Sequence, residues 1–227
     1  MVKSSLSKRG HKEIMMQLID AITQRKTIKL FDKNSKIPRE VLSEMLELAQ
    51  LAPSKANLQP WRFVAVDEDE QKQKLLDVVA FNAPPCESAA AVIVVLGDLQ
   101  YQTLLGDILD QSVAKGCLHQ NFRDRQFDFL MNTHQQLTEQ EIRDQVLIDS
   151  SLVAMQLMLI AKEKGYDTHA VGVFDRQKVL ERLEIDAQRY VPVMLLAIGR
   201  AAVPALPSAR LPLKYTVSWN RGYGFKR

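Results

Sequence analysis

The sequence predicts a single domain in which helices and strands are mixed, and three observations support this prediction. Apolar residues recur at helical spacing in several segments, of which residues 139–164 form the longest. Residues 89–96 form a continuous apolar run rich in Val and Ile, and residues 191–198 form another apolar run of strand length. No linker, internal repeat or low-complexity tract divides the 227 residues, so we assign residues 1–227 to one domain.

The N-terminal half is predicted to contain helices around one short strand. Pro38 suits the first turn of a helix, and Glu40 lies near the positive end of that helix. Residues 62–66 alternate and are rich in aromatic and β-branched side chains, as expected for a strand. The predicted elements are a flexible segment over residues 1–10, an amphipathic helix over residues 11–24, a helix from Pro38 that is closed by Pro53, a strand over residues 62–66 and a helical segment over residues 67–79.

The C-terminal half is predicted to start with the longest helix and to end in strands. Gly165 caps the helix of residues 139–164, and residues 168–174 follow as a strand. Asp175 can N-cap a short helix that runs through Leu183 and leads to the last apolar strand. This is the one crossover that has the pattern of a strand–helix–strand unit.

Two segments lack a clear pattern. Residues 100–138 are the least regular part of the chain and contain Phe122, Phe127 and Phe129 among charged and polar residues. Residues 201–227 are rich in Pro and have no core pattern of their own, which predicts an extended tail.

Composition argues against several classes of function. The net charge of +3 is small and basic residues are scattered among acidic ones, so we expect no nucleic-acid partner. Cys86 and Cys117 have no metal-ligand spacing and form no disulfide framework, and the four histidines show no paired spacing, so we expect no metal. The chain has neither a run of about 18 apolar residues nor the apolar run of a signal peptide, which predicts no membrane partner and a cytoplasmic location.

The common nucleotide-binding motifs are absent, so any phosphate must be held by side chains. The sequence contains neither Gly-x-Gly-x-x-Gly nor the phosphate loop Gly-x-x-x-x-Gly-Lys-Ser/Thr. Arg25, Lys26, Thr27 and Lys29 instead gather three cations and a hydroxyl within five residues. Such a group suits a dianionic phosphate, although a basic patch at the end of a helix is also the ordinary complement of the helix dipole.

Four further segments carry groups that suit cofactor binding. Residues 53–61, Pro-Ser-Lys-Ala-Asn-Leu-Gln-Pro-Trp, form a loop rich in amide and hydroxyl groups, and Asn82 precedes the first apolar strand. Residues 168–175, Thr-His-Ala-Val-Gly-Val-Phe-Asp, end a strand, and residues 208–212, Ser-Ala-Arg-Leu-Pro, lie in the tail. Turn-forming preferences alone also explain the Pro, Ser, Asn and Gly residues of these segments, and His169 suits a structural role better than a catalytic one.

Together these motifs resemble the FMN-dependent NAD(P)H nitroreductase family, and the resemblance covers residues 12–220 approximately. It implies an α+β fold with a central mixed sheet flanked by helices. It also implies a homodimer with two FMN sites at its interface. The extended C-terminal tail, residues 201–227, would be exchanged across the homodimer and embrace the partner.

The resemblance also implies roles for individual residues. The flavin phosphate would be held by Arg25, Lys26, Thr27, Ser208 and Arg210, and the pyrimidine edge would face Lys29 and Asn82. The loop residues Pro53, Ser54, Lys55 and Asn57 would contact the FMN held mainly by the other subunit, and the backbone of Val171, Gly172 and Val173 would approach flavin N5, with Gly172 as the catalytic position. Two departures stand out, because Pro85 replaces a Lys found in some relatives and Val173 replaces a common Gly.

The implied activity is the transfer of a hydride from NADH or NADPH, through flavin N5, to a nitroaromatic or quinone by a ping-pong mechanism. Residues 100–138 are expected to form a lid that selects this small-molecule acceptor. Three alternatives stay open: another flavin reaction such as dehalogenation or flavin breakdown, a non-enzymatic flavin-binding protein, and a nucleic-acid-binding module that uses the Arg25 cluster.

Overall fold

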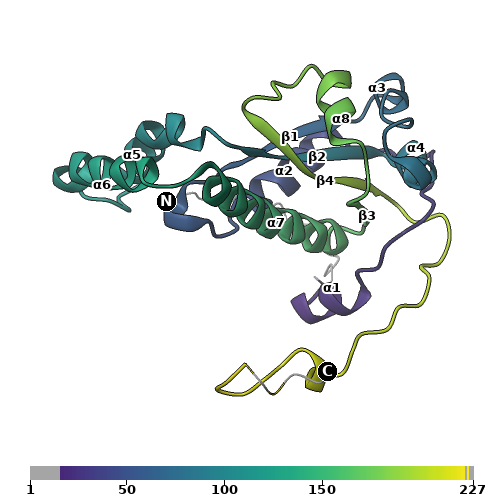
Figure 1. The fold of residues 1–227 in the computed structure, drawn as a ribbon. Helices are drawn as coiled ribbons and strands as arrows, with labels where there is room; N and C mark the ends of the chain where they lie inside the picture. The colour runs from purple at the N-terminus through teal and green to yellow at the C-terminus, as the bar shows by residue number, and fades with distance from the viewer. Residues whose placement is uncertain (1–15, 223, 225–227) are drawn as a thin grey trace, which may run out of the picture.

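A four-stranded antiparallel sheet forms the centre of the protein (Figure 1), whose computed structural model describes residues 16–222 and residue 224. The strands are β1 (Trp61–Val66), β2 (Ala91–Asp98), β3 (Asp167–Val171) and β4 (Tyr190–Gly199). Their order is β1-β2-β4-β3, so β2 and β4 are central and β3 is an edge strand.

The two apolar runs form the central strands because both of their faces are covered. Every residue of β2 is buried, and its side chains alternate between two cores. Ile93 and Val95 belong to one core cluster, whereas Val92 and Val94 belong to the other. A strand without a solvated face has no polar alternation, which explains the unbroken apolar sequence of β2.

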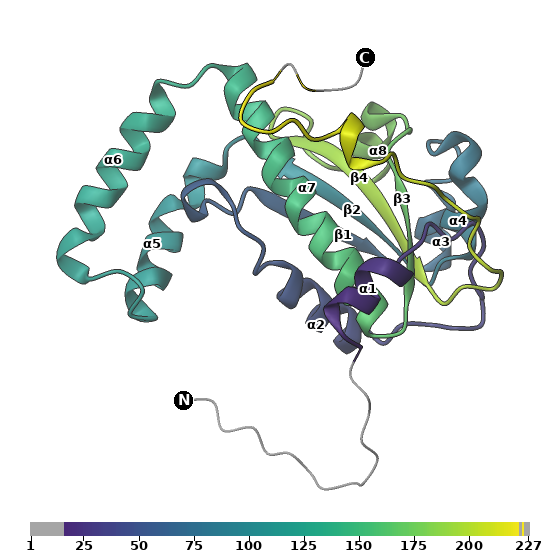
Figure 2. The same ribbon diagram turned by 90° about the horizontal axis from the view of Figure 1, so that it is seen from below.

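Helices lie on both faces of this sheet (Figure 2). They are α1 (Leu18–Gln24), α2 (Arg39–Ala49), α3 (Asp69–Gln73), α4 (Ala83–Ser88), α5 (Leu105–Ala114), α6 (Arg123–Gln135), α7 (Glu139–Glu163) and α8 (Arg176–Arg182). Helices α2 and α7 cover one face, where Met45 and Leu157 pack with Ile93. Cys86 of α4 and Val179 of α8 pack on the other face.

Helix α7 begins with a capping box and then crosses the sheet. The Glu141 N–H donates to Thr138 Oγ1 at 3.2 Å, and the Thr138 N–H donates to Glu141 Oε2 at 2.8 Å. By length and composition alone α7 could cross a membrane, which corrects the expectation that no segment is apolar enough. Its stripe through Val153 and Leu157 is fully buried against the sheet, so the packing of a core helix accounts for its apolar character.

The strongest sequence patterns are confirmed. The long helix and both central strands differ from their predicted bounds by one or two residues, and the helix after Pro38 is also found. The Asp175 side chain accepts from the Lys178 N–H at 3.1 Å and caps α8, as predicted. Of the predicted N-terminal helix, residues 18–24 are helical; residues 1–10 and 11–15 lie outside the described part of the chain.

Several predicted details are wrong. The helix predicted over residues 67–79 covers only α3, and α4, which follows, was not predicted. A mixed sheet was expected, but the four strands all pair antiparallel. Among the described residues, the parallel pairing is a single bridge between Thr27 and Thr168. The irregular residues 100–138 form α5 and α6. Because Leu130 is the one buried residue of α6, this helix needs little apolar sequence.

We expect Gly97→Ala to destabilise the fold by about 1–3 kcal/mol, because a Cβ at this position overlaps Val146 Cγ1 and crowds Val191. Urea or thermal unfolding measures the change. Gly106→Ala is the matched control, since the nearest atom to its Cβ is the flexible Arg123 guanidinium at 3.4 Å. Equal stability of the two variants would contradict the close packing of α7 on β2.

Candidate functional site

The Arg25 cluster lies along the exposed edge of the sheet. Helix α1 ends before Arg25, and the Ile28 N–H then donates to the Thr168 carbonyl of β3 at 3.1 Å. Ile28 is buried whereas Thr27 and Lys29 on either side are exposed. The pairing with β3 therefore turns the side chains of Thr27 and Lys29 away from the core.

A buried histidine connects this segment with Asn82. His169 Nδ1 lies 2.8 Å from the Ile28 carbonyl oxygen, and His169 Nε2 lies 3.1 Å from Asn82 Oδ1. His169 and Asn82 are both buried, with exposed fractions of 2% and 5%. Burial lowers the pKa of His169 below its ordinary value, and the charge of Lys29 lowers it further. The sequence did not indicate this link, because its partners are far apart in the chain.

The backbone after β3 is open to an outside group. Val171 is buried, but Gly172 is exposed and Val173 has an exposed fraction of 61%. A Cβ built on Gly172 meets no heavy atom within 4 Å, and its φ lies outside the left-handed region. Within the described residues, neither packing nor backbone geometry requires a glycine here.

The loop after α2 is held by a buried carboxylate of α7. The Lys55 N–H donates to Asp149 Oδ2 at 3.2 Å, and Gln145 Nε2 donates to Asp149 Oδ1 at 2.8 Å. Burial raises the pKa of Asp149, which is 2% exposed. Ser54 Oγ accepts from the Gln59 N–H at 3.0 Å. Asp149 was not among the residues predicted from the sequence.

This loop also stores backbone strain. Ala56, Asn57 and Gln59 have φ values of 49°, 58° and 47°, in the left-handed region that side-chain-bearing residues seldom adopt. Each such residue costs on the order of 1 kcal/mol or more, and strain of this kind concentrates at functional sites. Pro53, Lys55 and Asn57 are exposed and available to an outside group.

The structure brings only some of the predicted residues together within one chain. Thr27 bridges Thr168 of β3, with Arg25 and Lys29 two residues away on either side, Asn82 lies beside His169 of the same strand, and Gly172 follows its end. Asp149, which holds the Lys55 loop, is about 20 Å from the end of α7 that leads into β3, at the helical rise of about 1.5 Å per residue.

Ser208 and Arg210 belong to the tail that follows β4. The tail leaves the sheet after β4 and extends beyond α1 (Figure 1). Both residues are exposed, and Arg210 Nη1 donates to the adjacent Ala209 carbonyl at 2.9 Å.

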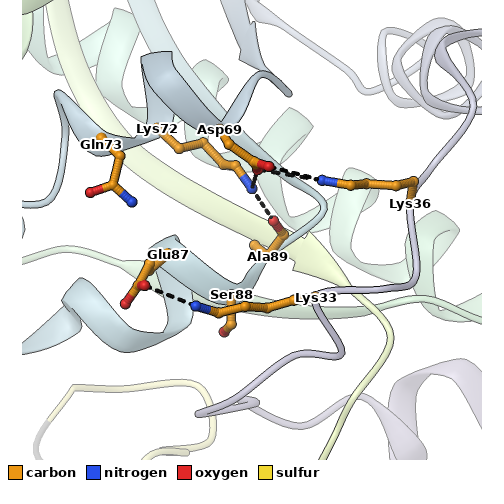
Figure 3. Close-up of a pocket in the computed structure, with 8 residues that line it drawn as sticks. All are labelled: Lys33, Lys36, Asp69, Lys72, Gln73, Glu87, Ser88 and Ala89. Carbon is orange, nitrogen blue, oxygen red and sulfur yellow. Dashed lines mark hydrogen bonds and ion pairs between the residues drawn. The ribbon is translucent and has the colours of Figure 1, made fainter.

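A well-formed cavity elsewhere does not qualify as a site. Figure 3 shows a cavity of about 210 Å³ beside α3 and α4, with three lysines in its lining. Lys33 pairs with Glu87 at 2.8 Å, and Lys72 pairs with Asp69 at 2.8 Å. Lys36 reaches the same Asp69 at 3.3 Å. By contrast, Arg25, Lys26 and Lys29 form no ion pair with acidic residues of the described chain. Free cations distinguish the β3 edge from this cavity.

Two cavities adjoin the segment expected to act as a lid. One of about 360 Å³ lies between Asn57 of the loop and Ile108 of α5. Another of about 350 Å³ is lined by Phe122, Phe129 and Arg125. Phe127 is half-buried and packs against a core cluster, with the Arg123 guanidinium 5.4 Å from its ring centre, and its part in the expected lid stays a prediction.

Metal ligands do not gather in the part of the chain that the structure describes: no group of three His, Cys, Asp or Glu side chains could hold an ion there. Cys86 and Cys117 are both free. Burial raises the pKa of the Cys86 thiol to about 12, which makes it unreactive at neutral pH.

Comparisons with known proteins give one consistent family. The sequence model of the Nitroreductase family matches residues 22–200. The chain is 40% identical over 195 residues to "Putative NAD(P)H nitroreductase YdgI" of Bacillus subtilis, covering 86% of this chain and 93% of that protein. It is 36% identical over 198 residues to "CLA biosynthesis enone reductase" of Lactiplantibacillus plantarum, covering 87% of this chain and 91% of the relative.

A solved structure extends this similarity to the fold. The protein, from Exiguobacterium sibiricum, is described as a putative nitroreductase in complex with FMN, and it superposes with a TM-score of 0.88 at 39% identity. The match covers 90% of this chain and 98% of that chain. The α+β fold expected from the sequence is confirmed by this agreement.

We expect the free energy of unfolding to fall as the pH drops below about 6.5, the ordinary pKa of histidine. The folded pKa of His169 is lowered, so the unfolded chain binds the additional proton. This contribution to stability is present above pH 6.5 and is lost as the pH falls through the lower folded pKa, by at most about 1.4 kcal/mol per pH unit. Urea unfolding between about pH 7.5 and pH 5.5 measures the slope.

His169→Asn should flatten this slope, while His119→Asn, at an exposed ring, should leave it unchanged. Part of the slope remains in His169→Asn because burial also lowers the pKa of His134. A variant slope equal to that of the wild type would show that His169 is not buried as a neutral ring.

Proposed function

The chain belongs to the nitroreductase family, and from that premise we propose that it is an FMN-dependent oxidoreductase that transfers hydride from NADH or NADPH to an electron-poor small molecule. A nitroaromatic or a quinone is the proposed acceptor. The observation that carries this proposal is the β3 edge, which combines cations that have no ion pair in the described chain, a buried amide and an open glycine backbone.

The residues present at this edge fit FMN. Arg25 offers a bidentate fork, Lys26 a point charge and Thr27 a hydroxyl, which together suit a dianionic phosphate. Gly172 leaves room for a flat ring to approach the backbone, since nothing of the described chain occupies the space of its missing Cβ. Asn82 adds an amide that can pair with the polar edge of the ring.

Bound FMN supplies the two-electron relay, so the proposed reaction requires no metal and no side-chain nucleophile. The chain has three tasks. Arg25 and Thr27 anchor the phosphate, and the exposed backbone of Gly172 and Val173 orients the ring. Lys29 supplies a positive charge that favours the more negative, reduced cofactor.

A homodimer is proposed because one chain presents two separate halves of a site. Ile148, Leu152 and Met155 form an exposed apolar stripe on α7, with exposed fractions of 58%, 43% and 39%. Apolar surface of this kind marks an interface. In the proposed dimer, the Lys55 loop of one copy faces the Arg25 cluster of the other. The tail would bring Ser208 and Arg210 to the phosphate across the interface.

The acceptor is proposed to bind beside α5 and α6. The two cavities there are lined by Asn57 and by the exposed rings of Phe122 and Phe129. The similarity to an enone reductase extends the proposed acceptors to other electron-poor double bonds. Two free cysteines suit the reducing cytoplasm as the proposed location.

The visible spectrum of the purified protein tests the function directly. We expect a flavin spectrum that bleaches with NADH or NADPH under nitrogen and returns when a quinone or nitroaromatic is added. A flavin that never bleaches would indicate a flavin carrier, and product analysis with and without oxygen separates other flavin reactions. A colourless protein that takes up no FMN would refute the proposal.

Replacement of Arg25 and Arg210 by Ala should release FMN, because two of its phosphate ligands are lost. We expect the variant to retain less than about one tenth of the wild-type flavin, since each charged contact contributes about 1.5–3 kcal/mol. Absorbance after gel filtration measures retention. The control is Arg182→Ala, which removes an exposed arginine of α8 that pairs with Asp77. Full flavin content in the double variant would disprove the phosphate assignment.

Gly172→Ala should weaken FMN binding about tenfold, or about 1.4 kcal/mol, while stability changes by less than about 0.5 kcal/mol. The reason is that the added methyl has open space in the chain itself and obstructs only an outside group. Flavin fluorescence titration and thermal unfolding measure the two quantities. Val173→Ala, which removes bulk from the adjacent exposed position, is the comparison. Unchanged FMN affinity in Gly172→Ala would place the ring elsewhere.

Leu152→Glu should convert the proposed dimer to a monomer and reduce flavin retention, because it places a charge in the apolar stripe of α7. Light scattering coupled to gel filtration gives the mass. Gln188→Glu adds the same charge at an exposed loop position and should remain dimeric. A dimeric, FMN-replete Leu152→Glu variant would exclude this face as the interface.

A further inference from the structure

The buried ring of His169 faces two oxygen atoms but has a proton for only one of them. Nδ1 lies 2.8 Å from the Ile28 carbonyl and Nε2 lies 3.1 Å from Asn82 Oδ1. Only a doubly protonated ring could donate to both. Burial and the charge of Lys29 lower the pKa of His169, so the ring is neutral at neutral pH.

The carbonyl of Ile28 decides which nitrogen carries the proton. A carbonyl oxygen only accepts, so Nδ1 must be the protonated nitrogen. Nε2 then has a lone pair and requires a donor. The Asn82 NH₂ group supplies this donor when the side-chain amide is flipped by 180°. The flip exchanges the positions of the amide oxygen and nitrogen and leaves the shape of the side chain unchanged.

The start of α4 frees the Asn82 side chain for this role. Asn82 occupies the N-cap position, where an Asn side chain usually accepts from the backbone N–H of the second or third helical residue. Those residues are Pro84 and Pro85, which have no N–H. Accordingly, the Asn82 side chain makes no capping bond, and its backbone N–H is satisfied by the Val79 carbonyl at 3.0 Å.

We propose that His169 is a positioning residue that fixes the Asn82 amide with its NH₂ toward the ring and its oxygen toward the cofactor site. The amide then offers a hydrogen-bond acceptor to an N–H of the bound ring. This inference rests on the proposed FMN function. It adds a specific role for a histidine whose sequence context favours a structural one.

The orientation determines what kind of partner Asn82 selects. The pyrimidine edge of an oxidised flavin has one N–H group between two carbonyls. An amide oxygen pairs with that N–H, whereas an amide NH₂ would pair with a carbonyl instead. The tautomer of His169 therefore sets the hydrogen-bonding character of this edge of the site. In the described chain the second polar atom of the amide is not among the buried atoms that lack a partner, and Asn82 keeps an exposed fraction of 5%.

The ring nitrogens of His169 can be observed directly by ¹⁵N NMR on the full-length protein as purified. We expect a protonated Nδ1 and an unprotonated, hydrogen-bonded Nε2 at neutral pH. Two protonated nitrogens, or a proton on Nε2 alone, would overturn the proposed orientation. Because this measurement needs no substitution, it does not depend on the folding of a variant.

A double-mutant cycle tests the effect on the cofactor. His169→Asn retains an N–H for the Ile28 carbonyl and removes Nε2, while Asn82→Ala removes the amide. We expect each substitution to raise the FMN dissociation constant about threefold to tenfold, as for one lost hydrogen bond. The double variant should be no weaker than Asn82→Ala alone, because His169 acts through Asn82.

The outcomes separate this inference from the proposed function. If the wild type binds FMN and the two substitutions multiply their effects on the dissociation constant in the double variant, the positioning role alone would be overturned. A wild type that binds no FMN would overturn both the function and the role of Asn82. His169→Gln, whose longer amide reaches the position of Nε2, should restore most of the affinity lost in His169→Asn, and failure to do so would also count against the positioning role.

Discussion

The pairing of residues 27–28 with the edge strand β3 is the interaction on which the candidate site depends. One backbone bond joins the Ile28 N–H to Thr168, and the Ile28 carbonyl accepts from the ring of His169. Ile28 is held in the core, so Thr27 and Lys29 must face outward. Without this pairing, a basic segment after a short helix would be only a solvated chain end. With it, the cations are fixed beside Asn82 and the open backbone at Gly172.

Helix α7 separates two groups of candidate site residues. It fixes the loop through Asp149 near its middle and leads into β3 at its end. Since the helix is rigid and packed on the sheet, one chain cannot bring the two groups together. The apolar stripe on the outer face of α7 offers a physical solution, in which a second copy covers the stripe and supplies the missing group. In the proposed dimer, dimerisation and cofactor binding would therefore be one requirement.

Sequence patterns predicted the helices and strands in which buried residues recur regularly over a long segment. Strand β2 and helix α7 were predicted because each repeats one pattern over many residues. Helix α6 was not, since a helix with one buried residue has no stripe. Contacts between residues far apart in the chain were also missed. The sequence around His169 does not indicate its contact with Asn82, and the sequence around Lys55 does not indicate its bond to Asp149. Gly172 was assigned to the site by resemblance, and the structure shows open space beside its backbone, which no sequence pattern indicates.

The replacement of Lys by Pro85 concerns the same corner of the site. Pro85 is buried at the start of α4, so a lysine at this position in the same backbone would have to extend out of the core or lose its charge. The two consecutive prolines instead remove the backbone donors that would have occupied Asn82. In the proposed site, the Pro84–Pro85 sequence thus has two effects: it replaces a lysine charge, and it leaves the Asn82 amide without a capping bond. In the proposed function, Lys29 would be the neighbouring charge that favours a reduced cofactor, while Asn82 and His169 would provide recognition through a neutral hydrogen bond.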